Sequence, residues 1–235
     1  MYRTILISIF FISLLGCAQN PYKQFYKEIN VSSKTVTPPD KPKIITSYNI
    51  NDDAQKYMSK YYIVKGFSAF NGKQYNDSQL IQQATDVGAS IVLKANQYTN
   101  TESSTHLLYA GEEGGYFTFP KHVRRYDQVT VFLAENVIKT FLYGITPKTM
   151  NSASKKMAGR NTGASVFIVY DKSPAFYANV LVGDVIIEVD GNPINEISDL
   201  SEPLSKKNSL KGYSDWKIIR EGKEKSILII LEDKQ

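Results

Sequence analysis

The sequence predicts a mixed α+β protein in which a small α/β domain precedes a second, β-rich domain. Three observations support this expectation. A chain of 235 residues is long enough for two small domains. Residues 61–95 pass from a β-type run through an amphipathic helical pattern to a second β-type run. Residues 173–194 combine a helix start, two turn signals and a strand of period two, which indicates short elements joined by tight turns.

The composition is that of an ordinary soluble globular protein, with 22% charged and 42% hydrophobic residues. Lys and Arg number 28 against 23 Asp and Glu, and the resulting charge of +5 is spread along the chain. A nucleic-acid partner requires a basic patch or stripe. The charge pattern therefore does not indicate nucleic-acid binding.

The amino terminus carries a targeting signal. Residues 1–16 hold one early positive charge, Arg3, followed by an apolar run that is too short to span a bilayer, so they are predicted to be a signal peptide. The run ends in Leu14-Leu15-Gly16-Cys17, and Cys17 is the single cysteine of the chain. A plain secretory peptide with a chance cysteine is the alternative.

The sequence Leu-x-Gly-Cys resembles the bacterial lipoprotein signal, which is cut before the cysteine so that the thiol can be acylated with fatty acids such as palmitate. The resemblance implies lipidation at Cys17 and a location in the cell envelope, at the outer membrane facing the periplasm. Several acyl chains would anchor such a protein firmly, since each buried methylene contributes about 0.8 kcal/mol.

Residues 17–42 show no sustained hydrophobic period and contain Pro21, Pro38, Pro39 and Pro42. We expect this stretch to be a tether that holds the folded part away from the membrane. The first folded domain is expected over residues 43–138.

The elements of that first domain follow in order. Residues 43–47 are expected to form a short strand, and residues 51–60 a short helix with acidic residues near its positive end. A strand is expected over residues 61–67. From Asp77, a good N-cap, four apolar side chains share one face of a helix, and Gly88 ends it: Leu80, Ile81, Ala84 and Val87.

A second strand is expected at residues 89–95, which completes a βαβ unit. Its two strands should be parallel neighbours in one sheet. Residues 98–124 are interpreted as a long polar loop in which residues 116–119 can form a hairpin. Residues 125–135 are expected to be an added strand.

The order of signals in residues 173–194 points to a known family. Ser173-Pro174 suits a capped helix start, Gly183 permits a sharp turn, and Asp190-Gly191 favours a tight turn after the strand at residues 185–189. This order resembles the centre of a PDZ domain, of the bacterial type found in trypsin-like stress proteases, site-2 proteases and tail-specific proteases. The resemblance implies that residues 139–235 are a PDZ domain, a β-sandwich or partly open barrel with two helices.

The resemblance also implies a binding site. In PDZ domains a glycine-containing loop receives the carboxylate of a peptide's C-terminus, and the strand that follows pairs with the peptide. Here the corresponding residues are Leu142, Tyr143, Gly144 and Ile145, and the helix at residues 198–207 corresponds to the other wall of the groove, with Leu200 and Leu204 on one face. Pro203 departs from that pattern: either the helix begins later or its first turn accommodates the ring.

The first domain has a weaker resemblance. Gly88-Ala89-Ser90-Ile91-Val92-Leu93 and Arg125-Tyr126-Asp127-Gln128 are similar to segments of uncharacterised bacterial lipoproteins that also carry a PDZ domain. This likeness implies no activity.

The sequence shows few of the residue patterns that catalysis requires. Its two histidines, His106 and His122, both fall in the loop at residues 98–124, no Gly-x-Ser-Gly-Gly nucleophile loop is present, and a triad pattern is not visible. Two histidines without a free cysteine fall short of the usual metal-ligand clusters, so no metal and no cofactor are expected. Asp127 is interpreted as an exposed or capping partner of Arg125.

We therefore expect a lipid-anchored, non-catalytic envelope protein that binds peptides or protein C-termini through a PDZ domain. Two alternatives stay open. The chain could be an accessory or degenerate component of an envelope peptidase, or a structural module in which the PDZ fold serves packing, dimerisation or assembly.

Overall fold

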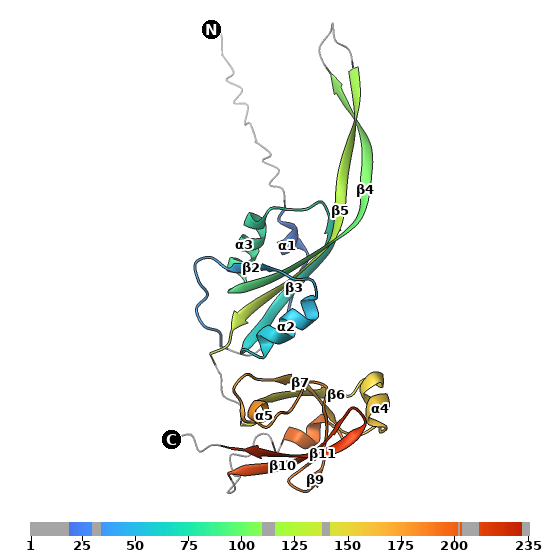
Figure 1. Ribbon diagram of the computed structural model, residues 1–235. Helices are drawn as coiled ribbons and strands as arrows, with labels where there is room; N and C mark the ends of the chain where they lie inside the picture. Colours follow the sequence, from blue (N-terminus) through green and yellow to red (C-terminus); the bar gives the residue numbers. More distant parts are fainter. Residues whose placement is uncertain are drawn as a thin grey trace, which may run out of the picture.

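The computed structural model describes residues 19–29, 34–109, 116–137, 142–201, 203 and 212–231. Two domains, each built around its own sheet, follow one another along the chain (Figure 1). The mixed α+β class predicted from the sequence is confirmed. Within the described residues, no helix combines the length and the apolar character needed to cross a membrane. Cys17 and the predicted signal peptide before it lie outside the described residues.

The sheet of the first domain has the order β1-β3-β5-β4-β2. Its strands are β1 (Tyr26–Glu28), β2 (Lys43–Thr46), β3 (Tyr62–Gly72), β4 (Ile91–Tyr109) and β5 (Tyr116–Glu135). Both β3 and β4 run antiparallel to β5, which lies between them. The two strands of the predicted βαβ unit are therefore parallel but are not neighbours. That part of the prediction was wrong because hydrophobic alternation fixes which face of a strand is buried, and not which strand lies beside it.

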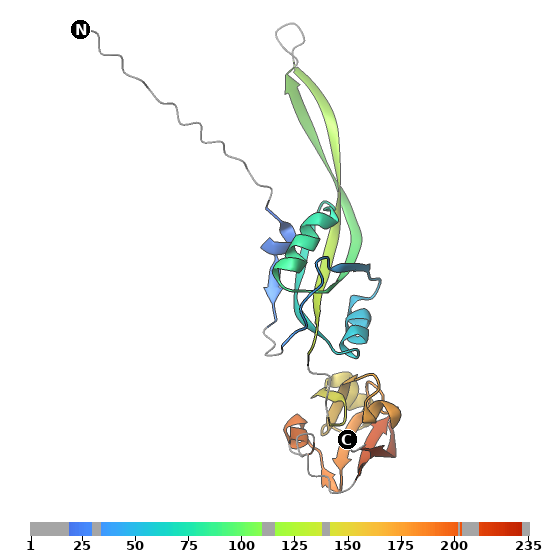
Figure 2. The ribbon, with the colours of Figure 1, turned by 90° about the vertical axis from the view of Figure 1, so that its left-hand side faces the viewer.

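Helices cover both faces of this sheet (Figure 2). On one face, α1 (Pro21–Gln24) and α3 (Asp77–Asp86) pack over Val92 and Phe132. On the other, α2 (Ile50–Met58) packs over Leu93 and Leu133. Successive strand residues point to opposite faces, which is why Val92 and Leu93 contribute to different clusters.

The predicted apolar face of α3 is largely confirmed. Leu80 and Ala84 are fully buried, and Ile81 is partly buried. Asn76, rather than Asp77, occupies the N-cap position, so Asp77 is the first helical residue and its carboxylate lies near the positive end of the helix dipole.

Residues 19–29 are folded, which corrects the predicted tether at its N-terminal end. Asn20 caps α1: its side chain accepts from Tyr22 N at 3.0 Å and donates to Gln79 O at 2.7 Å, in α3. The Tyr22 side chain is fully buried, with its ring 5.3 Å from that of Phe70. Helix α1 and β1 are thus part of the first domain, because an aromatic side chain buried this completely stabilises the segment that carries it.

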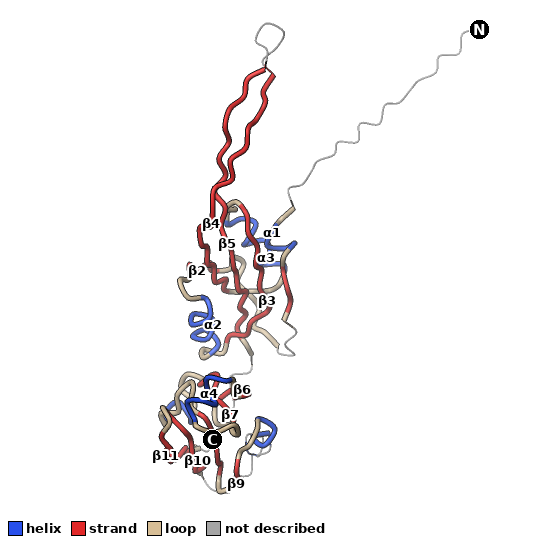
Figure 3. The backbone as a smooth tube through the Cα atoms, turned by 90° about the vertical axis from the view of Figure 1, so that its right-hand side faces the viewer, coloured by secondary structure: helices blue, strands red, loops and turns tan. Residues whose placement is uncertain are grey.

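The region expected to be a polar loop is a long hairpin instead. Strand β3 ends where Gly72 pairs with Tyr126, but the β4–β5 ladder continues to the pair Tyr109–Tyr116. This two-stranded ribbon extends away from the domain (Figure 3). The prediction failed here because residues 98–105 show no apolar alternation, and an antiparallel pair of strands need not have an apolar face.

The C-terminal domain holds the second sheet, of order β11-β10-β8-β7-β6, with β9 paired to β8. Its strands are β6 (Ile145–Thr149), β7 (Ala164–Val169), β8 (Val185–Val189), β9 (Asn192–Pro193), β10 (Tyr213–Arg220) and β11 (Lys223–Ile230), and its helical elements are α4 (Ser152–Ala158), α5 (Pro174–Tyr177) and the 3-10 helix η1 (Ile197–Leu200). The strand predicted at residues 185–189 is confirmed as β8.

Local chemistry explains the turns of this domain. Ser173 caps α5 by accepting from Phe176 N, and Pro174 occupies its first turn. The turns at Asp190-Gly191 and Glu221-Gly222 each hold two consecutive residues at positive φ, as their sequences predict. At the corner after Gly183, Asp184 accepts from Leu181 N and from two guanidinium nitrogens of Arg220, at 2.7–2.8 Å.

The two domains touch through α2 and the end of β7. Asp171 N donates to Ser59 O at 2.9 Å, and the rings of Tyr61 and Tyr170 stack with centroids 4.8 Å apart. The Gln55 side-chain amide donates to Phe167 O. These contacts place the first domain against the strand that lies next to β6.

Candidate functional site

Among the strands of the described residues, β6 is the outermost of its sheet and is paired with β7 alone. The 3-10 helix η1 lies beside β6. An unpaired strand edge with a helical element alongside is the geometry in which an extended peptide can be added to a sheet.

The loop before β6 directs two peptide N–H groups away from the protein interior. Tyr143 O accepts from Ala175 N at 2.9 Å, and Gly144 O accepts from Tyr170 N at 2.9 Å. In a trans peptide the N–H points opposite to the C=O. The N–H groups of Gly144 and Ile145, which share peptide bonds with these two carbonyls, therefore point outward from α5 and β7.

Gly144 makes this arrangement possible. Its φ of +79° lies in the left-handed region, where successive N–H groups can converge into a concave anion-binding nest. The hydroxyl of Ser173 donates to Gly144 O at 3.2 Å. The loop is thus held by the cap residue of α5.

A Cβ at Gly144 would meet Ser173 rather than open space, with Ser173 Cβ only 2.0 Å away. The glycine is therefore required by its packing on the cap residue of α5 and by its φ, so a larger residue would disturb the fold itself.

Tyr143 and Ile145 contribute to the site through their backbones. Their side chains are buried in the domain core, where the Tyr143 ring lies 5.1 Å from that of Trp216. Burial raises the pKa of Tyr143, and a hydrogen bond to Ser214 partly offsets the effect. Ser214 in turn donates to Asp190 at 2.9 Å, so the loop is tied to the Asp190-Gly191 turn.

The predicted side-chain wall of the groove needs correction. Leu200 is 0% exposed and packs in the core with Trp216, so it cannot touch a ligand. Leu204 lies outside the described residues. Leu142, in the loop, and Ile197, the first residue of η1, are partly buried against the same core. These two apolar side chains keep some exposure.

Sequence reasoning missed Pro147, which occupies the middle of β6. The signal was available, because a proline two residues into an edge strand removes a backbone donor from one side of that strand.

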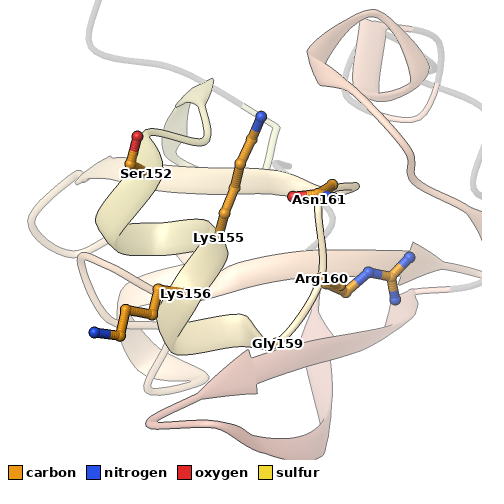
Figure 4. Close-up of a pocket in the computed structure, with 6 residues that line it drawn as sticks. All are labelled: Ser152, Lys155, Lys156, Gly159, Arg160 and Asn161. Atoms are coloured by element: carbon orange, nitrogen blue, oxygen red, sulfur yellow. The ribbon is translucent and has the colours of Figure 1, made fainter.

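Two depressions are lined by residues other than those of the loop. One, of about 500 Å³, borders α4 and includes Lys155, Lys156 and Arg160. Figure 4 shows the two lysine side chains extending in different directions, and the Arg160 guanidinium bonds to Thr162 Oγ1, so these cations do not converge on one anion position. The other, of about 350 Å³, lies between α2 and the C-terminal domain.

The remaining candidate residues show no catalytic arrangement in the described part of the chain. His122 is exposed, and its Nδ1 lies 2.8 Å from Ser103 Oγ; His106 lies in β4. Asp127 is exposed, as expected, and accepts from Asn71 at 2.8 Å, whereas Arg125 pairs with Glu102 at 3.1 Å and donates to Asn71. Among the described residues, no three His, Cys, Asp or Glu side chains gather as a metal site would require.

Comparison with known proteins identifies the second domain. Residues 144–231 match the family described as PDZ domain. No curated protein matches the chain. Among solved structures, the chain is similar to the HtrA3 PDZ domain bound to a phage-derived ligand, at 22% identity and a TM-score of 0.33, covering 40% of this chain and 86% of that one.

A second similar structure is the HtrA-type protease AlgW with a decapeptide, at 15% identity and a TM-score of 0.34. It covers 45% of this chain and 38% of the protease. The chain therefore spans well under half of that protease.

Proposed function

We propose that this chain uses its PDZ domain to bind the free C-terminus of a peptide or protein, which adds as a strand to the open edge of β6. The observation that carries the proposal is the outward direction of the Gly144 and Ile145 N–H groups. Two donors at the start of an open strand suit a carboxylate, and the strand beyond them supplies main-chain pairing. The HtrA3 PDZ domain with its phage-derived ligand and the HtrA-type protease AlgW with its decapeptide suggest the same kind of partner.

The polarity of the ligand follows from the position of the loop. The loop precedes β6, so a ligand whose carboxylate binds there must run antiparallel to β6, with its earlier residues beside Thr146 and Pro147. Ile145 faces this edge because Tyr170 N bonds to Gly144 O, which makes Ile145–Val169 a pair that exchanges no hydrogen bonds across β6 and β7. The last ligand residue can then exchange both of its backbone bonds with Ile145.

We propose further that the protein is non-catalytic and is anchored in the bacterial cell envelope by lipid attached to Cys17. The support for the anchor is the Leu14-Leu15-Gly16-Cys17 sequence after a short apolar run. The support for a binding role without chemistry is the scarcity of histidine and the single cysteine, which belongs to the lipidation motif.

A second candidate function is assembly, in which the PDZ domain packs on a partner without reading a C-terminus. The contact of α2 with Phe167 and Asp171 favours it, since the first domain already uses the PDZ fold as a packing surface. Service as an accessory to an envelope peptidase is compatible with either mode.

Titration of the full-length chain with a library of free-carboxylate hexapeptides, in parallel with C-terminally amidated copies, tests the binding proposal. Amidation removes the negative charge, so free-carboxylate forms are expected to bind at least tenfold more tightly, as charge-assisted hydrogen bonds contribute about 1.5–3 kcal/mol. Equal binding of both forms would reject C-terminal recognition, and no binding by any peptide would favour the assembly function.

The lipid anchor is tested separately by Cys17→Ser. The thiol is the atom that is acylated, so the variant should lose fatty-acid labelling and partition out of the detergent phase. Cys17→Ser protein that still labels with a fatty acid would overturn the anchor proposal.

A further inference from the structure

The backbone hydrogen-bonding groups along the open edge of β6 change at Pro147. Thr146 pairs with Ile168, but Pro147 pairs with Val166, so Phe167 is the extra residue of a β-bulge in β7. The bulge shifts the alternation of β7 and leaves that of β6 unchanged, which allows the direction of the Pro147 backbone to be worked out.

The N–H and the C=O of Val166 both form hydrogen bonds on the side of β7 that faces β8, away from β6. Its N–H donates to Asp184 O at 2.8 Å, and its C=O accepts from Gly183 N at 2.9 Å. Because Val166 faces β8, the pair Pro147–Val166 exchanges no bonds, and the backbone of Pro147 must face the open edge. Ile145 and Pro147 are therefore the two successive residues whose backbones face a ligand.

These two residues offer different bonding. Ile145 presents both an N–H and a C=O, whereas Pro147 presents a C=O alone. A ligand whose last residue pairs with Ile145 places its third-last residue opposite Pro147, because outward-facing residues alternate along a strand. The N–H of that third-last ligand residue can donate to Pro147 O. The C=O of the same ligand residue lies opposite the proline ring, which has no N–H to donate.

We propose that Pro147 limits recognition to the last two residues of a ligand C-terminus, with the ligand chain leaving β6 at its third-last residue. This specificity rests on the proposed binding of C-termini at β6. The ligand class is a free C-terminus whose two terminal residues are extended and whose preceding residue bonds its carbonyl to water. The affinity then depends little on the ligand residues that precede the last two, so many different C-termini can bind.

Backbone-ester analogues of a bound peptide test the proposal with the full-length chain. The probe is the tightest free-carboxylate hexapeptide from the library above, made in two ester forms. Form one replaces the N–H of the last residue by oxygen and removes the bond to Ile145 O. Form two places the ester between the third-last and second-last residues and weakens the carbonyl that lies opposite Pro147.

In the natural chain, form one should bind about five- to tenfold more weakly than the parent peptide, which is the effect of one lost hydrogen bond, and form two should bind as the parent does. In Pro147→Ala, the restored N–H should tighten the parent peptide by about five- to tenfold and make form two weaker than the parent. Thr149→Ala, at the exposed end of β6, is the matched strand control and should change neither comparison.

Weaker binding of form two to the natural chain would overturn the inference, because it would show that the third-last carbonyl has a donor. Parent-peptide binding to Pro147→Ala that is no tighter than to the natural chain would overturn it as well. The underlying binding proposal fails in a different way, by equal binding of form one and the parent together with equal binding of amidated copies.

Discussion

In the first domain, β4 and β5 form a hairpin, but the other neighbouring strands come from distant parts of the chain: Tyr62 of β3 lies opposite Glu135 of β5, and Tyr26 of β1 lies opposite Ser68. In the PDZ domain, β6 and β7, β7 and β8, and β10 and β11 follow one another in sequence. The first sheet is therefore completed by long-range packing, and the second by the chemistry of its turns. The comparison predicts that the two domains fail for different reasons when single residues are changed.

The largest effect is expected from Tyr22→Ala. The change removes a fully buried ring that fixes α1 against Phe70 and Tyr75, and should lower the stability of the first domain by about 3–5 kcal/mol. Far-UV circular dichroism during thermal unfolding measures the loss. Tyr48→Ala, which truncates a fully exposed tyrosine, is the control and should cause no change. An unchanged melting temperature in Tyr22→Ala would mean that residues 19–29 are a tether after all.

A smaller effect, of about 2–4 kcal/mol, is expected in the PDZ domain from Gly144→Ala. Gly144 and Gly191 both have a φ of +79°, but an added Cβ meets Ser173 at Gly144 and nothing within 4 Å at Gly191. Gly191→Ala should therefore incur the left-handed backbone cost alone, about 1–2 kcal/mol, and the difference between the two variants isolates the contact with Ser173.

Urea denaturation followed by Trp216 fluorescence suits this comparison. Trp216 is the single tryptophan of the chain and is fully buried in the PDZ core, so its signal reports the second domain. Equal midpoints for Gly144→Ala and Gly191→Ala would contradict the close packing of the loop on α5.

The pH dependence of the first domain sharpens the role of Tyr22. Burial raises the pKa of Tyr22 from its usual 10.0 to about 12, so the fold favours the neutral phenol. The resulting stabilisation is complete below pH 10 and is lost as the pH rises from 10 through about 12. Tyr22→Phe cannot ionise, and its stability should fall less steeply over that window than that of the natural chain. Parallel pH profiles would refute the burial of this hydroxyl.

The smallest effect is expected at the junction, where Gln55→Ala removes the amide that bonds to Phe167 O. One lost hydrogen bond between the domains should lower the Trp216 unfolding midpoint by the equivalent of about 0.5–1.5 kcal/mol. Gln82→Ala, an exposed glutamine in α3, is the matched control. Identical midpoints for both variants would mean that the domains unfold without influence on each other.

The same contrast explains how much of the fold the sequence predicts. Ser173-Pro174, Asp190-Gly191 and Glu221-Gly222 act within two or three residues, so a linear reading finds them, and the PDZ elements follow. The insertion of β5 between β3 and β4 depends on pairing across many residues, which hydrophobic alternation does not encode. Helix α1 is too short to show a period, although Asn20 before Pro21 is a usable cap signal.

For the candidate site, the sequence predicts which residues belong to it but not how their atoms are arranged. The family resemblance locates Gly144 and Ile145, and the structure adds that their N–H groups point outward. The spacing of Leu200 and Leu204 shows that they share a helix face, but not whether that face is turned to the core or to a ligand. Leu200 was therefore assigned wrongly to the groove wall. That the Pro147 backbone faces the open edge follows from the pairing of β6 with β7, which the sequence does not show.

Pro147 has a consequence for the protein in a crowded compartment. A strand edge that is open along its whole length can template a second copy of itself, and natural sheets avoid this with prolines, charges and short edge strands. Strand β6 spans five residues, and its central one lacks a backbone donor. Two molecules that met through this edge could not form a continuous ladder, so the feature that shortens the ligand also protects the domain against edge-to-edge aggregation.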